Sequence, residues 1–337
     1  METLTDSTGV IQHAIFSIPN RRTGYTTDDN ARALIAAVME FERTGSRQVL
    51  QLVSKYLSFL HYAQTPSGHF HNFMSYDQVW LDDQGSEDCF GRTLWGCGYA
   101  LSAELHPNVK KVAKQMFDGA MRWVPLTHSL RARAYMSMGL YYYLKFDPDS
   151  TSVRSALEKA ADSICKEYHT NAEPEWTWFE DVMTYSNGMI PRALFMAYQI
   201  FGKQEYLDVA VKSLDFLTSV CILDGMLYPI GCNGWYMRDY ERAWYDQQPV
   251  DPMGHTLSYL SAYDATQDEK YLALAKVCFD WFFGHNSVGE ALYDPVTGGC
   301  FDALAPDGAN LNQGSESTVC CLLTQLAMQP YLSKLPK

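Results

Sequence analysis

The sequence predicts an all-α fold, an (α/α)6 toroid of six helical hairpins with short β-hairpins in its loops. Three observations predict it. Segments that are apolar nearly all round alternate with segments that are apolar on one face only. This alternation recurs roughly every 40–60 residues. The loops that follow the one-faced segments are mostly long, whereas those that follow the apolar segments are short.

The apolar segments are expected to be the inner helices, because a helix without a polar face must be buried on most sides. Segment 129–144 is typical, since it carries two Arg and two Ser but no continuous polar face. Six such helices are predicted. They begin near Asp28, Cys89, Ser129, Asn187, Pro252 and Ser315.

The one-faced segments are expected to be outer helices with one side in water. In 152–168, for example, apolar residues recur at helical spacing from Val153 to Tyr168, and charged residues occupy most of the other face. The sixth outer helix is expected from either Ile11–Ser17 or Leu326–Leu335. The other five are expected at roughly 47–63, 108–123, 152–168, 204–221 and 269–284.

No Pro/Gly/Ser-rich linker interrupts the alternation, so one catalytic domain over 1–337 is predicted. Long irregular loops in a compact domain are usually functional. Here they gather where inner helices start, at about 64–88, 169–186, 222–251 and 285–314. The alternating stretches 69–74 and 225–230 are expected to form short hairpins there.

Composition excludes several functions. The net charge of −13 and the absence of any Lys/Arg run longer than a pair exclude a nucleic-acid binder and argue for a neutral substrate. Nine scattered Cys without a C-x-x-C indicate a reducing compartment. Neither a signal peptide nor a membrane-spanning run is visible, so a cytoplasmic protein without membrane contact is expected.

Acidic residues recur where inner helices begin. Helices that alternate in direction place the N-termini of every second helix at one end, so these acids are expected to line a common bowl. Each could instead cap its helix, and Asp251 before Pro252 fits an N-cap. In the paired cases one member can cap while the other faces the bowl. The acids are Asp28-Asp29, Glu87-Asp88, Glu180-Asp181, Asp251 and Glu316.

The same loops are rich in aromatic and amide side chains. Tyr and Trp faces can stack on a pyranose ring, while amides, His and Arg bind its hydroxyls. Alternatively, the rings cover the end of the barrel and stack on one another. The expected substrate-binding residues are Tyr25, Arg32, Arg92, Trp176, Trp178, Trp235, Trp244, Gln248, His255, Asn312 and Gln313.

Glycoside hydrolysis requires two carboxyl groups, one to protonate the leaving oxygen and one to activate water or attack directly. Glu180 or Asp181 is the first choice for the acid, because its aromatic loop should desolvate it. The base candidates are Asp251 and the pair Asp28/Asp29. Asp88 and Glu316 complete the catalytic set, and Glu316 could instead anchor a sugar hydroxyl.

The inner-helix arginines are expected to pair with these carboxylates. Arg32, Arg92 and Arg192 each follow an inner-helix start by about one turn. Such pairing would bridge neighbouring inner helices and hold some acids ionised. The chain contains no H-E-x-x-H, P-loop, G-x-S-x-G or dinucleotide fingerprint. Neither a metal nor a cofactor is therefore expected.

With these motifs in place, the chain resembles the six-hairpin, (α/α)6-toroid glycosidase superfamily, including glycosidase-like domains attached to sugar-transferring enzymes. The segments that carry the resemblance are TGYTTDDNARAL, SEDCFGRTLW, EWTWFEDVMTYSN and NQGSEST. The resemblance implies an oligosaccharide substrate, with mannose or glucose units, but it does not select the catalytic pair.

Two other functions stay open. A sugar epimerase or isomerase on the same fold would use His as acid and base, with His255, His13 or His128 as candidates. A non-catalytic carbohydrate-binding domain would keep the aromatic residues around the site, but its function would not be abolished by the loss of any one carboxylate. Terpene cyclisation is disfavoured because the loops are full of amides and acids. An oligosaccharide is the expected partner, and a homo-oligomer is left open.

Overall fold

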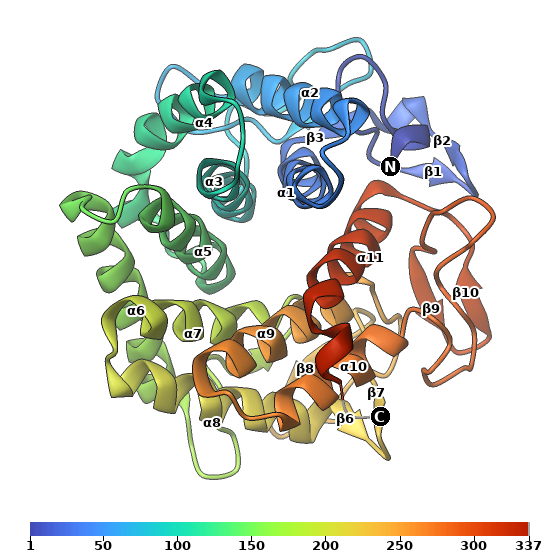
Figure 1. Cartoon of the computed structure of the whole chain (residues 1–337). Helices are drawn as coiled ribbons and strands as arrows, with labels where there is room; N and C mark the ends of the chain where they lie inside the picture. The colour runs from blue at the N-terminus through green and yellow to red at the C-terminus, as the bar shows by residue number, and fades with distance from the viewer. Residues whose placement is uncertain (336–337) are drawn as a thin grey trace. The chain divides into compact units, whose positions relative to one another are not determined.

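The structure is a computed structural model that describes residues 1–335 (Figure 1). It divides into two compact units, Met1–Ala160 and the part from Ala161 onward. The single domain over 1–337 stays a prediction. No helix among the described residues has the length and apolar content needed to cross a membrane.

The first unit is built from helices that pack in a fixed pattern. The helices α1, α3 and α5 pack against one another in that order, with α2 on α1 and α4 on α3 (Figure 1). Nearly every position of α5 is buried, whereas α2 and α4 bury one face. The bounds are α1 (Thr27–Thr44), α2 (Arg47–Ala63), α3 (Glu87–Ser102), α4 (Pro107–Ala120) and α5 (Leu130–Phe146), followed by α6 (Thr151–Asn171), which crosses the unit boundary.

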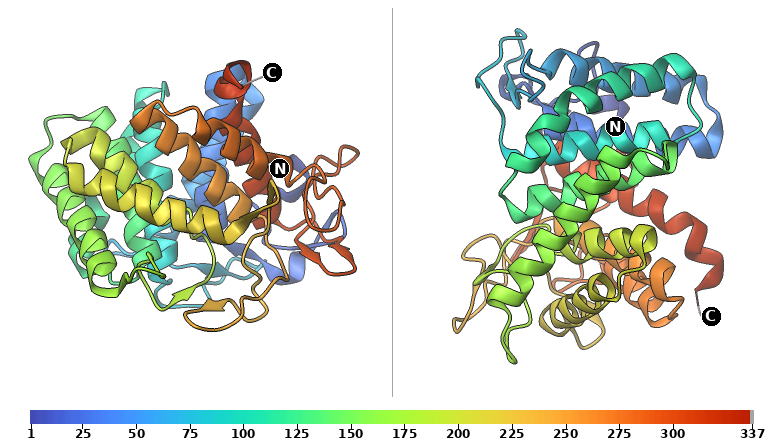
Figure 2. Two further views of the ribbon diagram at one scale, coloured as in Figure 1. Left: turned by 90° about the horizontal axis from the view of Figure 1, so that it is seen from below. Right: turned by 90° about the vertical axis from the view of Figure 1, so that its left-hand side faces the viewer.

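The second unit repeats this pattern. The helices α7, α9 and α11 are in contact in that order, with α8 on α7 and α10 on α9. The segment that joins α8 to α9 leaves the helical layer of this unit as an extended loop (Figure 2). The bounds are α7 (Met189–Phe201), α8 (Gln204–Cys221), α9 (Val250–Thr266), α10 (Lys270–Asp280) and α11 (Ser315–Met328).

The six inner helices are confirmed, and each begins within two residues of its predicted start. The five amphipathic helices are confirmed as well, although α4 and α10 end earlier than predicted. Pro125 lies in the 3-10 helix η3 (Met121–Leu126) that follows α4. Proline lacks the amide donor that a continuing α-helix needs.

Neither stretch proposed for a sixth outer helix forms one. Residues 11–17 contain strand β1 (Ala14–Ile15), which pairs with β2 (Ile18–Pro19). The tail forms a 3-10 helix, η4 (Gln329–Lys334), directly after α11. Pro330 in its first turn removes the donor that would extend α11.

The predicted hairpin at 225–230 is confirmed in part, because β7 (Met226–Leu227) pairs with the adjacent β6 (Ile222–Leu223). The hairpin predicted at 69–74 is also confirmed in part, because single antiparallel bridges join Phe70 to Gln64 and Met74 to Trp80. In addition, β4 (Phe73–Met74) pairs with β3 (Tyr25–Thr26), which directly precedes α1. A distant pairing therefore sets where α1 starts. The remaining strand pairs are β5 (Val182–Met183) with β8 (Tyr236–Met237) and β9 (Ala303–Ala305) with β10 (Gly308–Asn310).

Glycines let the inner helices of the first unit approach backbone to backbone. A Cβ atom on Gly98 of α3 would lie 2.2 Å from the carbonyl oxygen of Gly139 on α5. One on Gly139 would lie 2.4 Å from the carbonyl oxygen of Leu94. Only glycine fits such a crossing.

Candidate functional site

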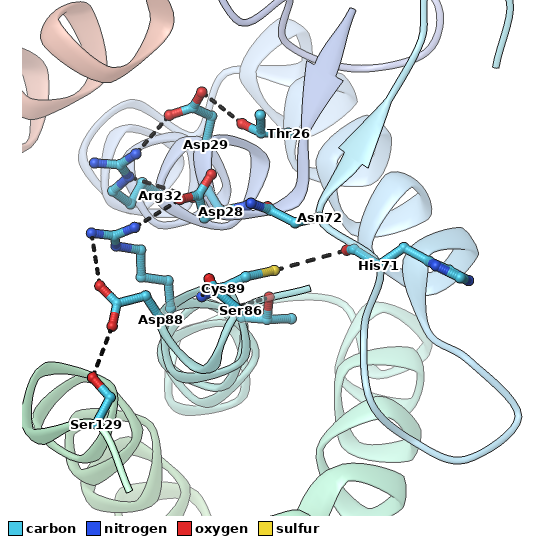
Figure 3. Close-up of polar contacts among 12 residues, drawn as sticks. Thr26, Asp28, Asp29, Arg32, His71, Asn72, Ser86, Asp88, Cys89 and Ser129 are labelled. Atoms are coloured by element: carbon cyan, nitrogen blue, oxygen red, sulfur yellow. Dashed lines mark hydrogen bonds and ion pairs between the residues drawn. The ribbon is translucent and has the colours of Figure 1, made fainter. Parts of the chain in front are cut away.

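The start of α1 presents a carboxylate held by arginine. The Oδ2 atom of Asp28 accepts a hydrogen bond from Nη1 of Arg92 at 2.7 Å. The backbone N–H of Asp28 donates to Oδ1 of Asn72, next to β4, so the β3–β4 pairing holds this residue in place (Figure 3). The Asp28 side chain is 17% exposed, against 5% for that of Asp29.

Arg92 bridges two inner helices, as predicted. Its Nη2 lies 3.5 Å from Oδ2 of Asp88, one turn earlier on α3. Its guanidinium carbon lies 4.8 Å from the centroid of the Tyr135 ring on α5. The other oxygen of Asp88 accepts from the hydroxyl of Ser129, the N-cap of α5, at 3.3 Å (Figure 3). The starts of α1, α3 and α5 are therefore joined by one polar network.

Asp29, the neighbour of Asp28, faces the protein interior and is 4% exposed. Its carboxylate accepts from Nη2 of Arg32 at 2.6 Å and from the hydroxyl of Thr26 at 2.7 Å (Figure 3). Asp29 therefore stabilises the first turn of α1. The predicted cap is wrong for this pair, because the N-cap of α1 is Thr26 and no side chain caps it. Asp29 is instead held by Thr26 and Arg32, and a role for Asp28 in a shared site stays a prediction.

Glu87 also has a structural position. Its Oε2 accepts from the backbone N–H groups of His128 and Ser129, at 2.9 and 2.5 Å. These donors lie at the start of α5, where a helix leaves its first amides unpaired. The carboxylate of Glu87 satisfies them from α3.

Electrostatics sets the charge of Asp28. Burial raises the pKa of its carboxyl, but the positive charges of Arg92 and Arg32 lower it more, so the pKa lies below its ordinary value of 3.8. Asp28 is therefore ionised at neutral pH. An ionised carboxylate can act as a base or a nucleophile but not as an acid.

In the second unit, the aromatic loop at 169–186 does not present its tryptophans to a ligand. Trp176 is 4% exposed and packs edge-on against Phe216 of α8, and Trp178 is fully buried against Phe179. The prediction that Trp176 and Trp178 stack on sugar is wrong, because both rings fill the core under this loop.

The acids of that loop differ from expectation. The side chain of Asp181 is 78% exposed and lies 3.0 Å from Nη2 of Arg238. The desolvation predicted for Asp181 is therefore absent, because the residue lies at the surface just before β5. Glu180 is half-buried, and its carbonyl oxygen accepts from the indole N–H of Trp176 at 2.7 Å.

Asp251 lies inside the first turn of α9, whose N-cap is Pro249, so the N-cap predicted at Asp251 is wrong. Asp251 is 1% exposed and His255 is not exposed at all. The backbone before α7 also packs closely on α9 here, since a Cβ on Gly188 would lie 2.4 Å from the carbonyl oxygen of Gly254. Asp251 is thus a buried carboxylate and not the accessible one expected.

His255 is held in one protonation state. Its Nδ1 lies 2.7 Å from the carbonyl oxygen of Asp251, which can only accept, so Nδ1 carries the proton. Burial lowers the pKa of His255 to about 4, which keeps the ring neutral at pH 7. Its Nε2 is buried and has no hydrogen-bond partner among residues 1–335.

The other predicted binding residues divide between core and surface. Tyr25 is 1% exposed, stacks on Tyr76 and donates to Asp6, so its predicted contact with substrate is wrong. Gln313 is buried and bonds Asp294 and Thr297. Those that keep accessible surface are Gln248, Trp235, Asn312 and Glu316, all partly buried, and Trp244, which is 45% exposed.

Sequence reasoning missed three members of the first-unit network: Asn72, Ser129 as a partner of Asp88, and Tyr135. Ser129 carried a signal, because it precedes an apolar helix as an N-cap residue does. Asn72 and Tyr135 carried none, since their contacts are with residues more than 40 positions away. Within the described part of the chain, no three His, Cys, Asp or Glu side chains are grouped to hold a metal ion.

No protein-family model matches this sequence, and no curated protein is detectably similar to it. Solved structures do match. Cellobiose 2-epimerase from Bacillus thermoamylovorans superposes with a TM-score of 0.75 at 11% identity, over 96% of this chain and 94% of that one. A GH76 α-mannanase from Bacteroides thetaiotaomicron superposes with a TM-score of 0.70 at 12% identity, over 99% of this chain and 93% of that one.

A third match is an α-1,6-mannanase of Salegentibacter, with a TM-score of 0.62 at 12% identity, over 96% of this chain and 94% of that one. It is an inactive variant with two adjacent aspartates changed to asparagine, in complex with α-1,6-mannotriose. The chain has the (α/α)6 toroid fold. The predicted fold class is thereby confirmed, and with identities this low the likeness concerns the fold.

Proposed function

We propose that the chain is a glycoside hydrolase-like enzyme that cleaves a neutral oligosaccharide with two carboxylates. The observation that carries the proposal is Asp28. It is the more exposed member of an adjacent aspartate pair, it lies at the start of an inner helix, and Arg92 and Arg32 keep it ionised. Glycoside hydrolysis needs such a carboxylate as base or nucleophile.

The fold and the residue type support this role. Changing two adjacent aspartates gives the inactive α-1,6-mannanase that shares this fold, and Asp28-Asp29 is an adjacent pair in this chain. In our proposal Asp28 reacts, while Asp29 fixes the helix turn that presents it. Asp29 would therefore be a positioning residue.

The second carboxyl must protonate the leaving oxygen. Besides Asp28, the predicted catalytic carboxyls that are partly buried are Asp88, Glu180 and Glu316. The amide series below identifies the second carboxyl by its loss of rate. Asp181 and Asp251 fit this role less well, because the first is largely in solvent and the second is enclosed.

A neutral substrate fits the charge of the chain. The net charge of −13 repels polyanions. Mannose- and glucose-containing oligosaccharides are the first to test, since enzymes with this fold include mannanases, a cellulase and a cellobiose epimerase.

The test is release of reducing ends from α-1,6-manno- and β-1,4-gluco-oligosaccharides. Each of Asp28, Asp88, Glu180 and Glu316 is changed singly to its amide, with the exposed Asp83→Asn as matched control. Asp28→Asn and one other variant should lose about a thousandfold in rate, given the scale of acid–base effects. Near-normal activity of Asp28→Asn would overturn the proposal.

His255 supports a second candidate function, a sugar epimerase or isomerase. The ring is neutral and its Nε2 is an acceptor, which is the state a proton-abstracting base requires. The complete burial of His255 counts against this function, because substrate would have to displace protein to reach it. Incubation of cellobiose or mannose in deuterium oxide discriminates, since an epimerase exchanges the C2 hydrogen and His255→Asn would abolish the exchange.

A non-catalytic carbohydrate-binding domain would give a third pattern. It would bind the oligosaccharides without releasing reducing ends. Single amide substitutions would then change the affinity for the oligosaccharide by graded amounts, and none would abolish binding.

A further inference from the structure

A surface groove of about 580 Å³ lies in the second unit, between the end of α8 and the loop that leads to α9. This volume is within the range of small-molecule sites. None of the predicted catalytic carboxylates lines it. The lining residues are Ser219, Val220, Leu223, Tyr236, Tyr240, Glu241, Arg242 and Trp244.

Two aromatic side chains of this groove are exposed to solvent, Tyr240 at 69% and Trp244 at 45%. Aromatic rings of this size are normally buried, because each can remove a large apolar area from water. Tyr236 is partly buried and packs edge-on against Trp176 at 5.1 Å between ring centroids, so the floor of the groove is anchored in the core.

Trp244 is exposed but held in place. The guanidinium carbon of Arg242 lies 4.5 Å from the centroid of its ring. Arg242 is itself fixed, because it donates to the carbonyl oxygens of Val220, Tyr228 and Pro229. A ring fixed before binding loses little conformational freedom when a ligand stacks on it.

The loop backbone is fixed as well. The N–H of Gly231 donates to the carbonyl oxygen of Ala243, and the N–H of Ala243 donates to that of Trp235, both at 2.8 Å. The segment that carries Tyr236, Tyr240 and Glu241 therefore has both of its ends fixed by backbone hydrogen bonds. Its aromatic side chains are in place without the loop having to close around a ligand.

We propose that this groove, which none of the predicted catalytic carboxylates lines, binds a neutral oligosaccharide. The rings of Trp244 and Tyr240 stack on the C–H faces of pyranose units, and the exposed carboxylate of Glu241 accepts from sugar hydroxyls. Glu241 and the net charge of −13 disfavour an anionic ligand. That the ligand is an oligosaccharide rests on the proposed function, whereas the location of the binding site rests on the groove and its lining residues.

The test is affinity electrophoresis of the full chain through gels containing yeast α-mannan or barley β-glucan. Trp244→Ala should weaken retardation at least about tenfold in apparent Kd, and Trp244→Phe should keep part of it. Tyr62→Ala is the matched control for Tyr240→Ala, because Tyr62 is 57% exposed on α2 and lies outside the groove.

The outcomes separate this inference from the proposed function. Asp28→Asn should lose turnover yet keep the retardation of the wild type. Retardation lost in Trp244→Ala supports the groove even if Asp28→Asn stays active, which would overturn the catalytic assignment alone. The proposal that the groove binds oligosaccharide is overturned if Trp244→Ala is retarded as strongly as the wild type. It is also overturned if neither gel retards the wild type.

Discussion

Replacing Arg92 by Met tests whether the Asp28–Arg92–Asp88 network is a buried ionic network. Met removes the charge and keeps most of the apolar stem. Arg92 is 7% exposed as a side chain, with Asp28 and Asp88 at 17% and 12%. Breaking a buried ion pair from one side costs about 3–5 kcal/mol, and the partial exposure of both acids places this case near 3 kcal/mol.

The expected shift in melting temperature follows from chain size. At about 2.1 cal/mol/K per residue, the 337 residues give an unfolding entropy of about 0.7 kcal/mol/K. A loss of about 3 kcal/mol therefore lowers Tm by about 4 °C. Differential scanning calorimetry at pH 7 measures it.

The effect must also depend on pH. The pKa of Asp28 is lower in the folded state than its ordinary 3.8, so its ionisation stabilises the fold above that pH and this contribution is lost as pH falls through the folded value. The Tm difference between wild type and Arg92→Met should be full at pH 7 and shrink below pH 3.8.

The matched control is Arg43→Met. Arg43 forms a bidentate pair with Glu40 on the same class of helix, but at 50% and 27% exposure. Exposed pairs contribute little, so its Tm should stay near that of the wild type. Equal shifts for Arg43→Met and Arg92→Met, or a difference that persists unchanged at pH 3, would refute the reasoning.

Three further predictions concern the stability of the inner helices. Glu87→Ala should cost about 1–2 kcal/mol, because two N–H groups at the start of α5 lose their acceptor, and Glu87→Gln should cost less, as urea denaturation will measure. Gly98→Ala should cost about 3 kcal/mol or more, since its Cβ meets the backbone of Gly139; a variant as stable as the wild type in urea would disprove the close crossing. The lowered pKa of His255, about 4 against 6.5, means that the unfolded chain binds a proton which the folded one does not. About 3 kcal/mol of stability should therefore be lost as pH falls from 6.5 to 4, and His255→Asn should flatten that slope in Tm measured against pH.

The helices could be predicted because their signal is local. The spacing of apolar and polar residues along one segment indicates which face of the helix is buried. The starts of α1 and α11 follow from residues in their own first turns. The contacts of Asp29 were foreseeable in kind, because Thr26 and Arg32 lie within one turn of Asp29. The partner of Asp28 was not, since Arg92 is 64 positions away and only packing brings the two together.

The aromatic loops show the other limit of sequence reasoning. A tryptophan between acids in an irregular segment has no periodic pattern to tell whether it faces inward. Trp176 and Trp178 were buried by Phe216 of α8, about 40 residues later in the chain. Trp244 is 45% exposed, and Arg242, two residues before it, is in cation–π contact with its ring.

Chemical rescue of Asp28→Ala by formate tests the catalytic assignment most directly. The substitution removes the carboxylate, and a small anion can occupy its place beside Arg92. The account predicts that Asp28→Ala releases no reducing ends above background and regains activity in proportion to added anion, whereas Asp83→Ala is unaffected. Full activity of Asp28→Ala without any anion would contradict it.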